Sequence, residues 1–280
     1  MVIVGVHVSI AGSIDRAVPR AVEKGCDTFQ IFSRNPRGWQ FKPLTDDVAA
    51  GFRQACATAG IQSPVVHMPY LPNLSSEKDE IYGKSLESLT VELSRCSQLG
   101  ISHLVTHLGH HGATGKMNGQ KRVVDAINTA LHASDPDVFL VLENTAGEKN
   151  SVGSDLTGLA EIIAAIDDPK RISICFDTCH AHAAGYDLRS EEAVGATFDL
   201  FDEEFGLDLL SIIHLNDAKG MLGSGLDRHE HIGLGAIGEE GFRAILHHPR
   251  LRHLTFIMET PEDDRRNDAG NIAEVRRLAA

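Results

Sequence analysis

The chain has 280 residues, with 39 Asp and Glu against 26 Lys and Arg, and a formal net charge of −13. Hydrophobic residues make up 42% of it and charged residues 23%, which excludes disordered, collagen-like and disulfide-stapled proteins. No apolar run approaches the ~20 residues needed to cross a bilayer. Five scattered cysteines without a C-x-x-C pair, and a start without a basic leader pattern, predict a cytoplasmic protein with free thiols.

Short apolar segments recur along the chain and have the composition of strands buried on both faces. In chain order they span Val2–Val8, Asp27–Phe32, Pro64–Met68, Ser102–His107, Val138–Glu143, Ile172–Asp177, Leu210–Leu215 and Leu254–Glu259. Helical periodicity lies between them: one helix from Thr45 to Gly60, one from after Ser76 to Gly100, and others over 119–133, 155–166, 190–205, 238–247 and 267–279.

Alternation of eight strands with helical stretches predicts an α/β protein with a single (β/α)8 TIM barrel over residues 1–280. A doubly wound open sheet alternates in the same way, because the pattern alone does not close the sheet. In a barrel we expect the active site at the C-terminal face of the strands.

Residues that can bind a metal lie at the end of seven of the eight predicted strands, as the last residue or the one before it: His7, His67, His107, Glu143, Asp177, His214 and Glu259. A polar residue is ordinary where a strand leaves the core, but that role alone would also give Ser, Thr, Asn, Lys or Gly. Because the C-terminal ends of barrel strands converge on one face, we interpret these side chains as candidate ligands.

Two clusters add further candidates: His180 follows Asp177 by three residues, and Asp227 and His229 lie in a Gly-rich loop. The nine candidate ligands are His67, His107, Glu143, Asp177, His180, His214, Asp227, His229 and Glu259. Five imidazoles and four carboxylates suit Zn²⁺ or Mn²⁺, and at roughly three protein ligands per catalytic zinc they would hold about three ions. Such ions would make the site locally positive, so the acidic chain is not excluded from binding a phosphate.

A loop after the second predicted strand mixes cations with aromatic rings. Ser33–Lys42 contains Arg34, Arg37, Trp39 and Phe41, a combination typical of a surface that grips nucleic acid. The alternative is that the two rings only pack the loop against the barrel. After the third strand, Tyr70 and Leu71 are candidates for a wedge between bases, or for a seal at the barrel rim.

Two other motifs carry less weight. Gly233–Gly238 matches G-x-G-x-x-G, but it follows a polar segment instead of a strand, which does not favour a dinucleotide site. Cys175 is expected to be a buried, inert thiol, and Cys179 is left open.

Several motifs resemble the endonuclease IV family of zinc-dependent apurinic/apyrimidinic (AP) endonucleases, over essentially the whole chain. They are Ser173–His180, His214–Lys219 continuing through Asp227–His229 to Gly235, His67-x-x-Tyr70-Leu71-x-Asn73, Glu143–Gly147, His7–Ser9 and Asn35-x-Arg37-x-Trp39. The resemblance implies a trinuclear zinc centre that hydrolyses the phosphodiester 5′ to an abasic site in double-stranded DNA. The products would be a 3′-hydroxyl and a 5′-deoxyribose phosphate, and we expect the enzyme to be a monomer.

Roles for individual residues follow from the same resemblance. His67, His107 and Glu143 would hold one zinc, and Glu143, Asp177, His214 and Glu259 a second. His180, Asp227 and His229 would hold the third. Arg37, Tyr70 and Leu71 match the residues that enter the duplex, while Glu143 and Glu259 are the candidates for proton transfer. The chain departs from the family at Leu108, where Pro is usual, and at Pro72, where Ile or Met is usual.

Two other functions remain open at this point. A metal-dependent sugar isomerase or epimerase on a similar barrel needs only about four ligands at the strand ends, and would not need His180, Asp227 or His229. A non-catalytic DNA-damage binder would need the loops but not nine ligands.

Overall fold

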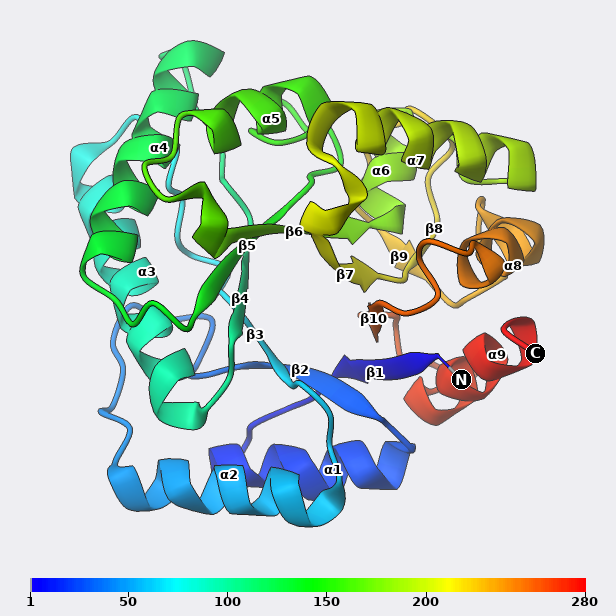
Figure 1. Ribbon diagram of the computed structural model, residues 1–280, viewed down its shortest axis with the longest axis horizontal. Helices are drawn as coiled ribbons and strands as arrows, with labels where there is room; N and C mark the ends of the chain where they lie inside the picture. The colour runs from blue at the N-terminus through cyan, green and yellow to red at the C-terminus, as the bar shows by residue number, and fades with distance from the viewer. Residues whose placement is uncertain (1) are drawn as a thin grey trace.

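The computed structural model describes residues 2–280 and contains one closed barrel of eight parallel strands (Figure 1). The strands are β1 (Ile3–His7), β2 (Thr28–Phe32), β3 (Val65–His67), β4 (His103–Thr106), β5 (Phe139–Glu143), β6 (Ile172–Asp177), β7 (Leu210–His214) and β10 (Thr255–Met258). Parallel pairing of β1 with β10 closes the circle. The predicted fold class is therefore confirmed, and the open sheet is excluded.

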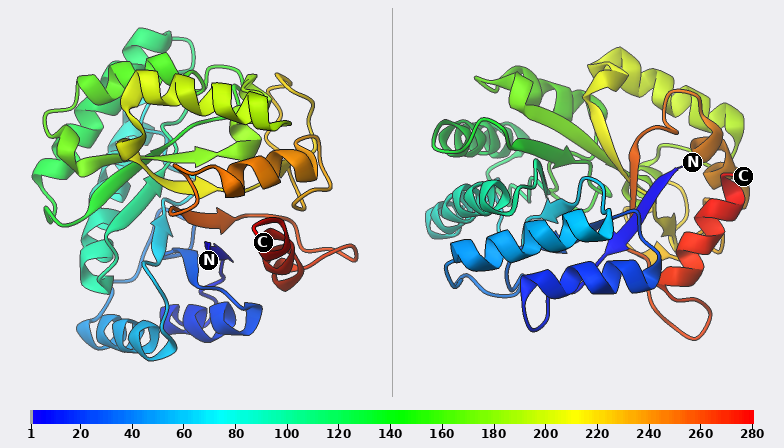
Figure 2. Two further views of the ribbon diagram at one scale, coloured as in Figure 1. Left: turned by 45° about the vertical axis from the view of Figure 1, so that its right-hand side comes forward. Right: turned by 60° about the horizontal axis from the view of Figure 1, so that its bottom comes forward.

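Helices surround the strands as an outer layer (Figure 2). They are α1 (Ala17–Lys24), α2 (Asp46–Ala59), α3 (Asp79–Leu99), α4 (Lys116–His132), α5 (Leu156–Ala164), α7 (Glu191–Phe205), α8 (Gly238–His247) and α9 (Asp268–Leu278). Short 3₁₀ turns cover Ile14–Arg16, Pro169–Arg171 and Leu207–Leu209. In the described part of the chain, no helix has the length and apolar character to span a membrane.

Two elements interrupt the regular alternation, and the sequence did not predict either. A short helix, α6 (Thr178–Ala184), begins directly at the end of β6. A two-stranded antiparallel sheet, β8 (Asp217–Ala218) with β9 (His229–Glu230), folds the Gly-rich loop after β7 back over the barrel. Both lie at the C-terminal face of the strands, so they add side chains to the face where the strand ends converge.

Six buried side chains fill the barrel interior as a cluster of their own: Val65, Val105, Val141, Cys175, Ile212 and Ile257. Each lies two residues before one of the candidate ligands of the strand ends, namely His67, His107, Glu143, Asp177, His214 and Glu259. Because side chains of a strand alternate between its two faces, residues two apart share the inner face. An apolar layer therefore supports the layer of candidate ligands from below.

Gly5 shows how tightly the first two strands pack. A Cβ at this position would lie 2.0 Å from the backbone oxygen of Thr28, so only glycine fits here without moving β2. This close approach brings β2 beside the end of β1, where His7 is paired in register with Gln30.

Candidate metal centre

Strand ends position six of the nine candidate ligands, and the two added elements position the other three. His67, Glu143, Asp177 and His214 are the last residues of their strands, while His107 and Glu259 directly follow β4 and β10. Asp177 also caps α6, because its Oδ1 accepts a hydrogen bond of 2.8 Å from the backbone N–H of His180. That cap places the His180 ring on the same face as the strand ends.

Glu143 is the centre of the arrangement and is completely buried. Its Oε2 lies 3.0 Å from Nε2 of both His67 and His107. Its other oxygen, Oε1, lies 3.0 Å from Nδ1 of His214 and 3.5 Å from Nδ1 of His180. A carboxylate whose two oxygens face different imidazoles has the arrangement required of a ligand that bridges two ions.

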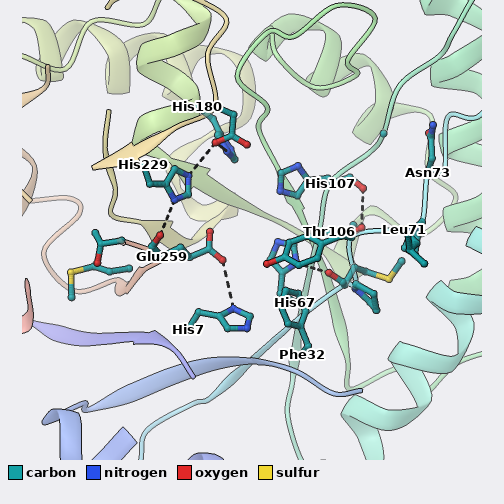
Figure 3. Close-up of a pocket in the computed structure, with 18 of the residues that line it drawn as sticks. His7, Phe32, His67, Leu71, Asn73, Thr106, His107, His180, His229 and Glu259 are labelled. Carbon is teal, nitrogen blue, oxygen red and sulfur yellow. Dashed lines mark hydrogen bonds and ion pairs between the residues drawn. The ribbon is translucent and has the colours of Figure 1, made fainter. Parts of the chain in front are cut away.

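A second cluster of side chains surrounds Asp227, which lies in the loop between β8 and β9 that folds over the barrel. Its Oδ1 is 3.3 Å from Nε2 of His180 and 3.4 Å from Nε2 of His229. His229 Nε2 is also 3.8 Å from Oδ2 of Asp177, which connects this group to the carboxylates below it. Figure 3 shows His180 and His229 on one side of the cavity and His67 and His107 on the other.

Donor atoms of the nine side chains gather in three groups, of which the first two share Glu143. Within each group the ligand atoms lie within 4.8 Å of one another: His67–His107–Glu143, Glu143–Asp177–His214–Glu259 and His180–Asp227–His229. The structure thus brings together all nine candidate ligands. His7 belongs to none of these groups. Its ring packs against that of Phe32 at 4.3 Å between centroids, with the two planes tilted by 50°.

Backbone carbonyl groups orient three of the imidazoles. Nδ1 of His67 lies 2.7 Å from the Met68 oxygen, and Nδ1 of His180 lies 2.9 Å from the Asn144 oxygen. Nδ1 of His229 lies 3.0 Å from the oxygen of Glu259. A carbonyl oxygen only accepts, so each Nδ1 carries a proton and donates it, and each Nε2 is left as the nitrogen that can bind a metal.

Mutual attraction between these buried groups moves their pKa values. Burial alone would lower the pKa of His180, but the negative charges of Asp177 and Glu143 raise it well above the usual value. Burial opposes the change at His229 too, but the nearby carboxylates of Asp227 and Asp177 raise its pKa to about 9. Burial opposes ionisation of Glu143, yet His107 and His214 hold its pKa well below the ordinary range. Protons on the imidazoles therefore balance the carboxylates when no cation does so.

The nine donor side chains fit divalent zinc, both in their chemistry and in the environment of one buried imidazole nitrogen. His229 Nε2 is buried and has no hydrogen-bond partner among residues 2–280, although it points toward two carboxylates. A buried polar atom without a partner is costly, and a bound cation would remove that cost. Imidazole nitrogens and carboxylate oxygens are ordinary zinc ligands, and three of the imidazoles have the outer hydrogen bond typical of metal-binding histidine.

Comparisons with known proteins add independent information. A family model described as a xylose isomerase-like TIM barrel matches residues 18–279. A probable endonuclease 4 of Methanoculleus marisnigri is 61% identical over 280 residues, which is 100% of this chain and 99% of the relative. The chain belongs to the endonuclease IV family.

Further comparisons distinguish relatives within the endonuclease IV family from a barrel that shares only the fold. A probable endonuclease 4 of Nitrosopumilus maritimus is 49% identical over 278 residues and 99% of each chain. The crystal structure of endonuclease IV from Thermus thermophilus matches with a TM-score of 0.88 and 35% identity over 98% of each chain. A 3-keto-D-glucoside 4-epimerase from Escherichia coli matches with a TM-score of 0.72 over 99% of this chain, but at 14% identity. That last likeness shows the fold alone.

The two departures from the endonuclease IV pattern leave the ligands in place. Leu108 is completely buried and its side chain packs against Gly153. Pro72 lines the cavity beside Leu71. Neither Leu108 nor Pro72 belongs to a donor group, so both departures leave the candidate ligands unchanged.

A cavity of about 790 Å³ lies over the candidate ligands, and Tyr70 and Leu71 line it. Tyr70 is 69% exposed, although its ring contacts Phe32 at 4.9 Å between centroids, and Leu71 is 39% exposed. Arg37 is exposed as well, in the loop that follows β2. All three residues proposed to enter DNA are thus accessible on the face that carries the site, and their role in binding stays a prediction.

One cation of that loop has a different environment from the one its sequence suggested. Arg34 is buried and forms an ion pair of 2.6 Å with Glu92 of α3, so it is not free to contact a phosphate. Its guanidinium group also lies over the ring of Phe41, at 5.4 Å from the centroid. The expectation that Arg34 belongs to the nucleic-acid surface is therefore wrong, because a buried carboxylate on the neighbouring helix satisfies it.

Sequence reasoning missed the buried amides that hold the carboxylates. Asn216 Nδ2 donates to Oδ2 of Asp177 at 2.8 Å, while its Oδ1 accepts the backbone N–H of Glu259 at 2.7 Å. Asn144 exchanges two hydrogen bonds with the backbone of Asp177. Gln30 contacts both His214 and Glu259. Asn144 directly follows a strand-end ligand, and Asn216 follows one by two residues, which is the signal that could have found them.

The remaining motifs have structural roles. The Asp217 carboxylate accepts backbone N–H bonds from Gly235 and Ile237, at 2.9 and 3.0 Å, so the Gly233–Gly238 segment wraps around a buried side chain. Cys175 and Cys179 are buried, and burial raises the pKa of both thiols, that of Cys175 to about 12. The expectation of an inert Cys175 thus agrees with its surroundings, and the same environment answers the question left open for Cys179.

Proposed function

We propose that this chain is an AP endonuclease that hydrolyses the phosphodiester 5′ to an abasic site in double-stranded DNA, using a trinuclear zinc centre. The products would be a 3′-hydroxyl and a 5′-deoxyribose phosphate. The observation that carries the proposal is the gathering of nine donor side chains into three groups, two of which share Glu143, beneath an open cavity. Membership of the endonuclease IV family supports the same reaction.

Each group of donors would hold one ion. His67, His107 and Glu143 would hold the first, with Glu143 shared by the second, whose other ligands are Asp177, His214 and Glu259. His180, Asp227 and His229 would hold the third. When bound, Zn²⁺ supplies a nucleophile from water near neutral pH and neutralises negative charge on phosphate and leaving-group oxygens.

Protein groups have to hold and move the proton of that water. Glu143 and Glu259 are the two candidates, and their surroundings differ. Glu143 is completely buried, and imidazoles face both of its oxygens. The Glu259 side chain is 22% exposed and lines the cavity. Partial burial would raise the pKa of its carboxyl group, but the charge of His214 lowers it below the usual value. A low pKa makes either carboxylate a weak base, so access to the cavity decides between them. Glu259 lines the cavity and is therefore the stronger candidate.

Recognition of the lesion would come from the rim of the cavity. Tyr70 and Leu71 would enter the duplex as an apolar wedge, and Arg37 would place a positive charge beside the vacated position. An abasic nucleotide has no base to unpair, so its extrusion into the cavity costs less than that of an intact nucleotide. The proposed substrate is therefore duplex DNA. We also propose that the enzyme acts as a monomer.

A metal-dependent sugar isomerase or epimerase is the second candidate, supported only by the barrel that the family model and the epimerase neighbour share with this chain. Such an enzyme would not need Asp227 and His229 as metal ligands, although the segment from β8 to β9 brings both into the site. The test is to incubate the zinc-loaded protein with an end-labelled duplex that contains one abasic site, and separately with ketose and aldose substrates. Incision 5′ to the site, with the intact duplex uncut, supports the proposal. Sugar interconversion without any nicking contradicts it.

A further inference from the structure

The second strand contributes no candidate ligand, yet it places a buried amide inside the site. Gln30 is completely buried and is paired in register with His7 on β1 and with Val65 on β3. Its side chain makes three contacts, all with groups of the site: Glu259 Oε1 at 2.7 Å, His214 Nε2 at 2.8 Å and His7 Nδ1 at 3.1 Å. Two of these partners are candidate ligands from different strands.

The carboxylate of Glu259 determines which way the amide points. An ionised carboxylate only accepts hydrogen bonds, so the NH₂ end of Gln30 must face Glu259 and the carbonyl end must face His214. The reverse orientation would put the amide oxygen against a carboxylate oxygen, with no proton between them. His7 Nδ1 accepts the second N–H of the same NH₂ group.

Amide orientation then determines the tautomer of His214. Because the Gln30 carbonyl oxygen only accepts, His214 Nε2 must carry the proton. The unprotonated nitrogen of the neutral ring is therefore Nδ1. That atom lies 3.0 Å from Glu143, 3.6 Å from Glu259 and 3.9 Å from Asp177, surrounded by the carboxylates of the second proposed ion.

This arrangement is the opposite of that at the other oriented imidazoles. His67, His180 and His229 donate from Nδ1 to backbone carbonyls and present Nε2 to the site. His214 presents Nδ1, and the side chain of Gln30 supplies the acceptor that a backbone carbonyl supplies elsewhere.

We propose that Gln30 is a positioning residue, which selects the Nε2–H tautomer of His214 and fixes the Glu259 carboxylate so that both face the second ion. The inference rests on the metal centre of the proposed function. Loss of such an outer hydrogen bond typically weakens metal binding by about 10–100-fold.

The test compares zinc binding by the full chain and its Gln30→Met variant, which keeps the length of the side chain and removes both ends of the amide. Chelator competition, without DNA, measures the affinity for each zinc equivalent. Gln120→Met is the matched control, since Gln120 of α4 donates to the Gly158 carbonyl and does not line the cavity. We expect one zinc equivalent to bind about 10–100-fold more weakly in Gln30→Met and none to change in Gln120→Met.

A second measurement needs no change at Gln30. Long-range ¹H–¹⁵N spectra of histidine-labelled, zinc-loaded wild type report which imidazole nitrogen carries the proton, and His214→Gln identifies the signals of His214. A protonated Nε2 with Nδ1 bound to metal is expected. A protonated Nδ1, or zinc affinity in Gln30→Met within twofold of wild type, overturns the inference.

The outcomes also separate this inference from the proposed function. Zinc binding that depends on Gln30, in a protein that never incises abasic DNA, supports the positioning role and contradicts the reaction. Incision of abasic DNA with zinc affinity independent of Gln30 supports the reaction and contradicts the positioning role. A wild-type chain that binds no zinc contradicts both.

Discussion

Glu92 of α3 and Arg34 of the loop after β2 form a buried ion pair, with 2.6 Å between Oε1 and Nε. The Glu92 and Arg34 side chains are 0% and 4% exposed. Ser33 donates to the other oxygen of Glu92, and Arg95 donates to Ser33 in turn. The loop that carries Arg37 is thus anchored to a helix from inside, and Arg37 remains exposed at its surface.

Replacing Glu92 by Ala should therefore destabilise the protein strongly. Removing one partner of a buried ion pair leaves the other charge unpaired, which typically costs about 3–5 kcal/mol in the free energy of unfolding. Denaturant titration of the variant measures this cost. Glu87→Ala, an exposed position on the same helix, is the control and should change the free energy by less than about 0.5 kcal/mol. Equal stability of the two variants would contradict a structural role for the pair.

Arg37→Ala should weaken binding to abasic duplex by about 1–3 kcal/mol and reduce its salt dependence, because a charge near the phosphates is lost. Zinc content and melting temperature should stay close to wild type, since Arg37 is exposed and belongs to no ligand group. Fluorescence titrations at several salt concentrations, on abasic and intact duplexes, measure both effects. Unchanged affinity for abasic duplex would exclude Arg37 from recognition.

Tyr70→Ala and Leu71→Ala should also weaken binding to abasic duplex, but with little change in salt dependence, because neither side chain is charged. The same titrations apply, and the intact duplex is the internal reference. If both variants bind abasic duplex as tightly as wild type does, these side chains line the cavity without acting as a wedge.

His229→Ala separates the three-metal centre from a simpler isomerase site. His229 belongs to the group that includes His180 and Asp227, and its Nε2 has no other partner among the described residues. We expect about one zinc fewer per chain and a loss of incision by orders of magnitude, with the circular-dichroism spectrum unchanged. Full incision by this variant would remove the third ion from the mechanism.

Stability of the metal-free protein should depend on pH through His229. Its pKa is raised from 6.5 to about 9, so the protonated imidazole stabilises the fold fully below pH ~6.5. That contribution is lost as the pH rises through ~9. Melting temperatures measured with chelator should therefore fall over this window, and fall less in His229→Gln. Added zinc should reverse the trend, since it binds the deprotonated ring. A melting temperature of the chelated wild type that rises across the window would contradict this assignment.

The strands and the ligand layer were predictable because both follow from local patterns. Short apolar runs alternate with helical periodicity, and the parallel barrel carries their ends to one face. Thus His67, His107 and Glu143, far apart in the chain, could be placed together from the positions of their strands alone. Helix ends were predictable for the same reason, as at Gly60 and Gly100, which end α2 and α3 in the left-handed conformation.

Contacts that depend on three-dimensional neighbours were not predictable. The sequence around Arg34 suggests a surface cation. Only the packing of α3 against the loop shows that Glu92 pairs with it. Gln30 reads as one polar residue in an apolar strand, and only barrel closure brings it to His214 and Glu259. The β8–β9 pairing likewise depends on the path of a Gly-rich loop, for which the sequence has no periodic signal.

The most direct test of the central claim is a zinc titration of the metal-free protein, followed at each step by incision of a duplex with one abasic site. Saturation is expected at about three zinc ions per chain, with full incision only as the last site fills and a melting temperature that rises with occupancy. Full incision by protein from which all metal has been removed, or at a single bound ion, would contradict it.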